Sequence, residues 1–387
     1  MSNDSYTLYG MAGSLYTAKV RAYLRQRRLP FVEKPAGGEE FLKTVVPHVG
    51  RWIIPVVKTP EGELLQDGTD IIDALEERHN SDERLGPTLA PAGIVGVISS
   101  LFELFGSEGL LRPAMHYRWN FDDSNLAFLE AAFEDVMPAG MNAEEREATF
   151  LKSSGRMRKA AQLFGVAPHS IETIERSYET FLALLEHHLS ATPFLLGAYP
   201  TLADYALLGP LYAHLGRDPY PAALMKRVAP HVYRWTERMN APETIEDHIA
   251  AKMQAGLFAD TALPASLTAL LGFIAEDYLP ELQAHVAYAG AWLAERPSLP
   301  AGSNGLDDPA ARNLGMTPFE WRGIEITSVV MPYRFYLLQR VQAAVERLSA
   351  DERMQLDGIF AQSGLAPLLQ LHLPRRVTRV NHLEVWQ

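Results

Sequence analysis

Apolar and polar residues alternate over the first eighty positions in an order that predicts a small mixed α/β domain. Strands are expected where short apolar runs stand between turn residues, at 6–9, 30–34, 53–57 and 64–65. Helices are expected where apolar residues recur at helical spacing, at 14–28, 39–44 and 67–79. The predicted order of elements is therefore βαβαββα.

The stretch around the third predicted strand carries the most distinctive residues of this domain. Pro55 enters the strand, although proline cannot donate a hydrogen bond to a β-ladder. Two interpretations stay open: an edge strand, or a cis Ile54–Pro55 bond that leaves the Ile54 backbone free to pair with a bound peptide. Asp67 can cap the helix that follows, and free N–H groups at Gly68 and Thr69 suit a carboxylate.

Beyond a linker at 86–93, strand signals nearly vanish and longer helical patterns take over. Helices are expected at 94–106, 125–137, 143–164 and 171–189. Thr201, with Asp204 three residues on, forms a variant of the capping box at the start of a further apolar helix. A helix cap contributes ~1 kcal/mol of stability, so we interpret these two residues as determinants of the fold.

Residues 241–387 form a long extension with further helical patterns. Helices are expected at 262–296 and 332–348, with a loop rich in Gly, Pro, Asn and Asp at 297–315 between them. The basic segment 375–380 is interpreted as solvated or paired with the protein itself, which is the usual fate of short charge clusters. We expect the extension to pack on the helical region and to contribute a wall to a substrate pocket.

Composition narrows the classes of function. The chain has 387 residues, of which 47% are hydrophobic, enough for two or three domains with a sizeable core. A net charge of −12 argues against a nucleic-acid partner. The absence of cysteine excludes disulfides, thiolate metal sites and a cysteine nucleophile. With no N-terminal signal pattern and no run of ~18 apolar residues, we expect a cytoplasmic protein with no membrane partner.

Candidate chemistry lies where the first strand leads into the first helix. The hydroxyl of Ser14 can donate a hydrogen bond to a thiolate, and the positive end of the helix adds to that effect. The same serine can instead do no more than cap the helix, and the residue chemistry does not choose between these roles. There is no HExxH, P-loop or GxSxG motif, so no metal site is expected.

These motifs resemble the glutathione-binding half of the glutathione transferases, whose first domain is thioredoxin-like. In that family a hydrophobic residue and a cis-proline precede a strand, and an acidic residue and a serine then open a helix. Ile54, Pro55 and Asp67 match this pattern. Gly68 stands where the serine is usual, which removes one hydroxyl from the γ-glutamyl carboxylate site, although Thr69 follows at once.

The run from 193 to 204 is similar to the loop and capping box of the family's α-helical domain. The resemblance therefore implies three parts. A thioredoxin-like glutathione-binding domain would span 1–85, an all-α transferase domain would span 86–240, and the mostly helical extension would fill 241–387.

The resemblance also implies an activity. The enzyme would activate the glutathione thiol, as a co-substrate, for attack on a small hydrophobic electrophile, as in detoxification. Ser14 aligns with the catalytic serine of serine-type members, while Tyr9 is the alternative because tyrosine-type members place a phenol near that position. The cysteinyl backbone would pair with Ile54, and the γ-glutamyl carboxylate would lie at Gly68 and Thr69.

Two further expectations follow from the resemblance. A homodimer is implied, because transferases pair the first domain of one subunit with the helical domain of the other, and symmetric pairing is common in soluble proteins. The alternative function is a non-catalytic module of the transferase fold that binds a ligand or a partner. Gly68 and the long extension favour that alternative.

Overall fold

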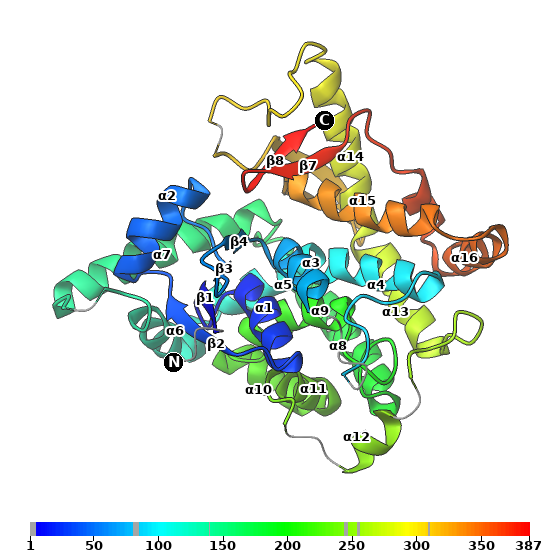
Figure 1. Ribbon diagram of the computed structural model, residues 1–387, viewed down its shortest axis with the longest axis horizontal. Helices are drawn as coiled ribbons and strands as arrows, with labels where there is room; N and C mark the ends of the chain where they lie inside the picture. The colour runs from blue at the N-terminus through cyan, green and yellow to red at the C-terminus, as the bar shows by residue number, and fades with distance from the viewer. Residues whose placement is uncertain (1–4, 80–84, 139, 244–246, 254–255, 309) are drawn as a thin grey trace.

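The computed structural model describes residues 5–79, 85–138, 140–243, 247–253, 256–308 and 310–387 (Figure 1). The N-terminal part contains a four-stranded sheet in the order β2-β1-β3-β4, in which β1 and β2 are parallel and the other neighbours are antiparallel. Its strands are β1 (Tyr6–Gly10), β2 (Phe31–Pro35), β3 (Val56–Lys58) and β4 (Leu64–Gln66). Its helices are α1 (Leu15–Gln26), the π-helical turn η1 (Phe41–Val45), α2 (Val46–Val49) and α3 (Gly68–Arg78). The predicted order βαβαββα and the thioredoxin-like fold class are confirmed.

The two faces of the sheet bury different sets of side chains, as the two-residue period of a strand requires. Leu8 and Val57 belong to the large core that also contains apolar residues of α1 and α3. Tyr9 and Val56 point to the opposite face, where Phe41 of η1 covers them. Since α1 also packs against α9, the N-terminal sheet is joined to the helical domain through α1.

The helical domain follows the predicted pattern closely. Its elements are α4 (Ile94–Leu104), the turn η3 (Phe105–Gly109), α5 (Leu111–Trp119), α6 (Asp122–Glu134), α7 (Ala143–Leu163), α8 (Ile171–Ala191), α9 (Leu202–Ala213), α10 (Pro219–Val228) and α11 (Pro230–Asn240). Asp204 is fully buried and accepts hydrogen bonds from the backbone N–H groups of Thr201 (3.0 Å) and Leu195 (2.8 Å). The structure thus places this carboxylate at the start of α9, in the capping role expected of it.

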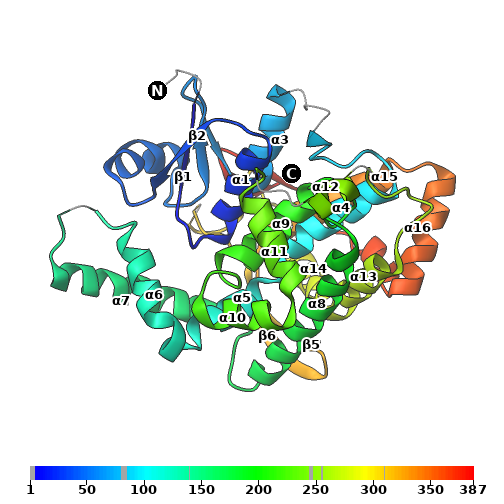
Figure 2. The same ribbon diagram turned by 90° about the horizontal axis from the view of Figure 1, so that it is seen from below.

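One helical segment, Ile94–Trp119, is long and apolar enough to cross a membrane by length and composition alone. Burial gives a simpler account of its hydrophobicity, because 89% of the apolar window lies inside the protein. Helices α9 and α15 (Pro332–Glu346) pack against α4, and Figure 2 shows α4 and α5 surrounded by other helices. The segment is therefore explained as the central core helix of this domain.

The extension is more varied than the sequence suggested. Its remaining elements are α12 (Asp247–Lys252), α13 (Ala265–Asp277), α14 (Leu279–Ala294), β5 (Gly315–Trp321), β6 (Ile324–Val330), α16 (Ala350–Ser363), the 3₁₀ turn η5 (Ala366–Gln370), β7 (Val377–Val380) and β8 (Leu383–Trp386). The prediction of a single helix over 262–296 is wrong, since the segment is divided at Tyr278 into α13 and α14. Pro280 stands in the first turn of α14, where proline is tolerated, but it would break the middle of a continuous helix.

The expectation that strands vanish beyond the linker is also wrong, because the extension contains two β-hairpins. Each has a two-residue turn whose residues both adopt positive φ, Arg322–Gly323 in β5–β6 and Asn381–His382 in β7–β8. Figure 1 shows the β7–β8 hairpin and α15 beside α3 and α4, far from their positions in sequence. The extension therefore covers part of the N-terminal domain as well as the helical domain.

Candidate active site

Three segments that carry predicted site residues meet at one end of the N-terminal sheet. Tyr9, near the end of β1, pairs with Val56 of β3, and Val56 pairs with Gln66 of β4. The loop after β1, the loop before β3 and the helix start after β4 must therefore lie at the same end. These are the loops that hold Ser14, Ile54 and Asp67.

Ser14 is the N-cap residue of α1. Its backbone is extended, and its Oγ accepts a hydrogen bond from the Thr17 N–H at 3.2 Å. The capping role considered from the sequence is therefore present. Capping uses a lone pair of Oγ, and the contacts described around this half-buried residue include no hydrogen bond donated by its O–H. The hydroxyl proton remains available for a thiolate, so the two roles are compatible.

Tyr9, the alternative to Ser14, is 1% exposed and lies on the sheet face that packs against Phe41, with ring centroids 5.8 Å apart. Burial, reinforced by the charge of Glu40, raises the pKa of the Tyr9 phenol well above its ordinary value. A phenol in this position is enclosed by the protein, so Ser14 is better placed to meet a ligand.

The loop before β3 has the geometry predicted for peptide binding. The Ile54–Pro55 bond is cis, which confirms that prediction. Strand β3 begins only at Val56, and the backbone hydrogen bonds described for the chain include none to the N–H or C=O of half-buried Ile54. These two groups therefore remain open for pairing with a peptide backbone.

Asp67 caps α3 as predicted, and this changes what the helix N-terminus can offer. Its Oδ1 accepts hydrogen bonds from the N–H groups of Thr69 at 2.9 Å and Asp70 at 3.5 Å. Asp67, Gly68 and Thr69 are all buried, and the Lys19 ammonium donates to the Thr69 hydroxyl at 3.0 Å. The predicted carboxylate site is thus enclosed by the protein's own groups.

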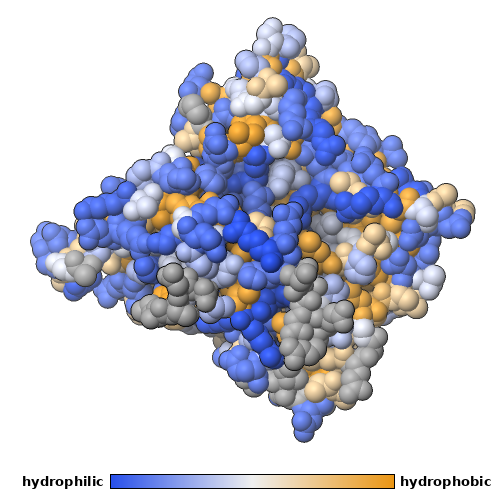
Figure 3. Space-filling model, in the orientation of Figure 1, coloured by the Kyte–Doolittle hydropathy of each residue, from blue (hydrophilic) through white to orange (hydrophobic). Residues whose placement is uncertain are grey.

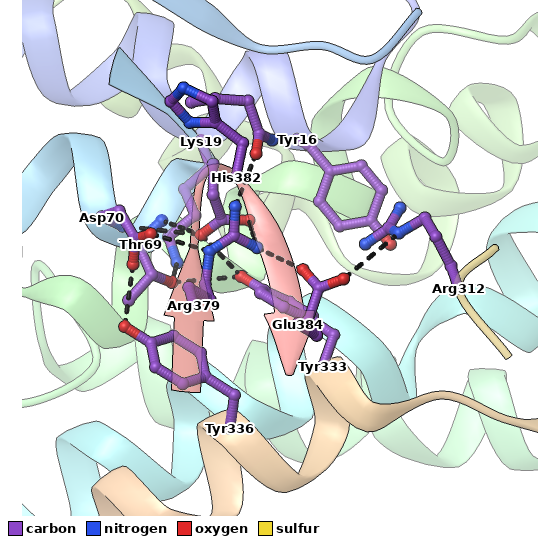
Figure 4. A network of polar contacts seen from close by, with 12 residues as sticks. Tyr16, Lys19, Thr69, Asp70, Arg312, Tyr333, Tyr336, Arg379, His382 and Glu384 are labelled. Atoms are coloured by element: carbon purple, nitrogen blue, oxygen red, sulfur yellow. Dashed lines mark hydrogen bonds and ion pairs between the residues drawn. The ribbon is translucent and has the colours of Figure 1, made fainter. Parts of the chain in front are cut away.

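The groups that enclose it come from the extension, and sequence reasoning missed them. Figure 4 shows Arg379 of β7 directed at the start of α3. Its Nε donates to Asp70 at 2.8 Å, and its Nη2 donates to Gln66 at 2.5 Å. The hydroxyl of Tyr333 donates to Asp67 at 3.0 Å. Within the basic segment, Arg379 pairs with acidic residues of the predicted site, Arg375 donates to the backbone oxygens of Leu299 and Gln387, and Arg376 is exposed.

The far end of the same hairpin contacts the loop that leads to the cis-proline. Arg51 donates through Nη2 to the backbone oxygen of His382 at 2.7 Å. The carboxylate of Glu384 lies 3.7 Å from Arg51 and 3.9 Å from Arg312. Burial, aided by the charge of Arg312, lowers the pKa of Arg51 to about 10. The hairpin therefore connects the loop before β3 with the start of α3.

Charge at the start of α3 is closely balanced. Burial and the neighbouring charge of Asp67 raise the pKa of Asp70 to about 6, in spite of its pairing with Arg379. Burial alone would lower the pKa of Arg379, but the charges of Asp67, Glu384 and Asp70 outweigh burial and raise it. A buried cation is thus held by several carboxylates, one of which is costly to keep ionised. Within the described ranges, no three His, Asp or Glu side chains are grouped so that they could hold a metal ion.

Comparison with known families identifies the two domains. A sequence model of the glutathione S-transferase N-terminal domain matches residues 8–84, and one of the C-terminal domain matches residues 170–243. The chain carries both domains of the glutathione S-transferase family. The part of the chain after residue 243, which includes the hairpin over α3, lies outside both matches.

Several solved structures are similar to this chain. One is a glutathione S-transferase from Methylobacterium radiotolerans in complex with glutathione sulfonate, at 19% identity, covering 67% of this chain and 98% of that chain, with a TM-score of 0.36. Another is a beta-etherase from Sphingobium sp. strain SYK-6, at 18% identity, 64% and 98% coverage and a TM-score of 0.42. A third is a glutathione transferase from Phanerochaete chrysosporium in complex with oxidized glutathione, at 17% identity, 66% and 97% coverage and a TM-score of 0.37. No curated protein matches the chain.

Proposed function

We propose that this transferase-family protein is a glutathione-dependent enzyme that activates the glutathione thiol for attack on a small hydrophobic electrophile. The observation that supports the proposal is the convergence of Ser14, the open Ile54 backbone and the start of α3 at one end of the sheet. Detoxification in the cytoplasm, as expected from the sequence, forms part of the same proposal.

Each segment has a defined role in this proposal. The cysteinyl backbone of glutathione pairs with Ile54, and the γ-glutamyl carboxylate lies at the start of α3 beside Gly68 and Thr69. The Gly68 N–H is the donor in this proposal, because Asp67 already accepts the Thr69 N–H. Ser14 donates its O–H to the sulfur, which favours the thiolate once the thiol proton has gone to solvent. The thiolate sulfur then forms a bond to the electrophilic carbon, while the electron pair of that carbon's broken bond leaves with the displaced group or is protonated.

A second candidate function has one specific observation in its favour. Arg379 and Tyr333 cover the start of α3, where the γ-glutamyl group would lie, and Thr69 is fully buried. In this alternative the extension replaces the ligand permanently, and the chain is a non-catalytic module that binds a partner through other surfaces.

Glutathione binding separates the two candidates. A ligand that binds only the folded state stabilises it by ~2.7 kcal/mol at a hundred times its dissociation constant. We therefore expect the thermal unfolding midpoint to rise with glutathione concentration. Cysteinylglycine, which lacks the γ-glutamyl group, is the control and should leave the midpoint in place. Equal midpoints with and without millimolar glutathione would favour the non-catalytic module.

We also propose the homodimer expected from the family. In this chain α15 packs on α4, and Tyr336 of α15 donates to Asp70 of α3 at 2.8 Å, so the extension covers both helices. Figure 3 shows hydrophobic residues scattered among hydrophilic ones on the face seen in Figure 1. A dimer would therefore form through a surface other than the one on α3 and α4 that the extension covers. Light scattering at micromolar concentration should give twice the chain mass of 43.1 kDa, and a monomer mass would contradict the proposal.

A further inference from the structure

The β7–β8 hairpin carries a cation and an anion that pair with each other across its two strands. Each of them also contacts charged residues of the proposed glutathione site (Figure 4). The cation is Arg379, whose Nε lies 2.8 Å from Asp70 at the start of α3. The anion is Glu384, whose carboxylate lies 3.7 Å from Arg51 and 3.9 Å from Arg312. A single short element therefore pairs with charged groups at the start of α3 and in the loop before β3.

Glutathione carries charges of the same kinds. Its γ-glutamyl end bears an ammonium group and a carboxylate, and its glycyl end bears a second carboxylate. The proposed function places the γ-glutamyl end at the start of α3, where the ammonium would be drawn to the carboxylates of Asp67 and Asp70. The guanidinium of Arg379 already contacts both carboxylates, at 3.9 Å and 2.8 Å. The hairpin and the ligand would therefore compete for the same residues.

We propose that the β7–β8 hairpin is an autoinhibitory latch, in which Arg379 takes the place of the γ-glutamyl ammonium. Glutathione then binds only after the hairpin tip has moved away from the start of α3. This inference rests on the proposed function. It adds that the protein occupies its own ligand site and that binding is coupled to a movement of the C-terminal hairpin.

The construction of the hairpin separates a fixed base from a polar tip. At the base, Trp386 is 1% exposed, stacks near Trp292 and accepts through its backbone oxygen from the Gly302 N–H. The two strands pair with each other and belong to no larger sheet, and a two-stranded hairpin is marginally stable by itself. Near the tip, Arg379 and Glu384 make polar contacts, and water can replace their hydrogen-bond partners. The tip can therefore open while the base stays in place.

The energetics of the tip also suit a latch. Buried ion pairs gain Coulombic attraction but lose hydration, so the net gain from burying them is small. Here Asp67 and Asp70 are enclosed together beside a single guanidinium, which lessens that gain further. A small difference between open and closed forms is what allows a ligand to shift the population.

The test compares two hairpin variants with the wild type. Arg379→Ala removes the cation, and Arg376→Ala removes an exposed arginine immediately before β7 as a matched control. Calorimetry should show at least tenfold tighter glutathione binding for Arg379→Ala and unchanged binding for Arg376→Ala, because apparent affinity scales with the open fraction. Amide hydrogen exchange at residues 378–385 should be faster in Arg379→Ala alone.

A locked variant covers the case in which Arg379→Ala folds poorly. His48 and His382 have ring centroids 5.8 Å apart, and the chain has no cysteine of its own. The double variant His48→Cys with His382→Cys can therefore be joined by a short bismaleimide, which glutathione cannot reduce. We expect the joined protein to lose glutathione binding and the unjoined protein to keep it.

The possible outcomes are distinct. Equal glutathione affinity in the wild type, Arg379→Ala and the joined protein would overturn the latch and leave the proposed function standing. Weaker binding by Arg379→Ala would also overturn the latch, since Arg379 would then help to hold the ligand. If Arg379→Ala has a fast-exchanging hairpin and still binds no glutathione at millimolar concentration, the proposed function fails and the latch fails with it.

Discussion

Replacing Arg334 with methionine should lower the free energy of unfolding by about 3–5 kcal/mol, the usual cost of removing one partner from a buried ion pair. Arg334 is 1% exposed and extends from α15 into the centre of the molecule. Its Nε donates to Glu108 at 3.1 Å and its Nη1 donates to Glu281 at 2.6 Å. Methionine fills similar space but leaves both carboxylates without this cation, and urea denaturation measures the loss.

The loss should depend on pH in a defined direction. Burial alone would raise the pKa of Glu281, but the charges of Arg334 and Arg112 outweigh burial and hold it well below the ordinary value. A carboxylate with a lowered pKa stabilises the folded state above its unfolded pKa, and that contribution is lost as the pH falls. Without Arg334 the pKa of Glu281 rises, so the variant lacks this contribution. The difference from wild type should therefore be larger at pH 7 than at pH 3, since the contribution is lost below the unfolded pKa of a glutamate, ~4.3.

Arg347→Met is the matched control, because Arg347 is exposed at the C-terminal end of the same helix. Exposed substitutions of this kind change stability by less than about 0.5 kcal/mol. Comparable losses at the two positions would show that the methionine side chain, and not the removal of a buried charge, is responsible. A pH-independent loss at Arg334 would contradict the ionic account.

The cluster around Arg334 explains why the extension belongs to the folded core. The Tyr16 hydroxyl of α1 donates to Glu108 of η3 at 3.3 Å, and Glu108 accepts from Arg334 of α15. Glu281 of α14 accepts from Arg334 and also from the hydroxyl of Ser328 at 2.8 Å. One chain of contacts thus connects the N-terminal domain, the helical domain and the extension. The polar tip of β7–β8 lies beyond this fixed part, which is why it alone is proposed to move.

Features of the N-terminal site that depend on neighbouring residues could be predicted from the sequence. Periodicity of apolar residues located β1–β4, α1, η1 and α3, since each strand or helix buries a face set by its own spacing. The caps at Ser14 and Asp67 follow from the preference of short polar side chains for helix starts. The sequence also indicated that the Ile54 backbone could pair with a peptide, because proline disturbs a strand in a limited number of ways.

The contacts made by the extension could not be predicted in this way. Arg379 and Asp70 are 309 positions apart, and no local pattern states which carboxylate an arginine will reach. The β7–β8 turn at Asn381–His382 contains no glycine, so the usual hairpin signal is absent. The turn at Arg322–Gly323 does contain one, between residues that alternate in burial along β5, and this signal could have revealed that hairpin.

The largest functional effect is expected from Ser14→Ala. If the Ser14 hydroxyl donates to the bound thiolate, its removal deletes a hydrogen bond to a charged group worth ~1.5–3 kcal/mol. The pKa of the glutathione thiol in the complex should then rise by about one to two units from its value beside Ser14. Activity at neutral pH should fall by roughly ten- to a hundredfold and return in part at higher pH. Glutathione affinity should change much less, because the contacts at Ile54 and at the start of α3 remain.

If Ser14 only caps α1, the same substitution should give a different result. The Thr17 N–H would lose its acceptor, and stability would fall by ~1 kcal/mol with the thiol pKa unmoved. Thiolate absorbance titrated against pH in the glutathione complex distinguishes the two roles, with Ser14→Thr as the control that keeps a hydroxyl. Tyr9→Phe should leave the titration in place, because Tyr9 is enclosed on the far face of the sheet. A titration that moves in Tyr9→Phe and stays fixed in Ser14→Ala would transfer the catalytic role to the tyrosine.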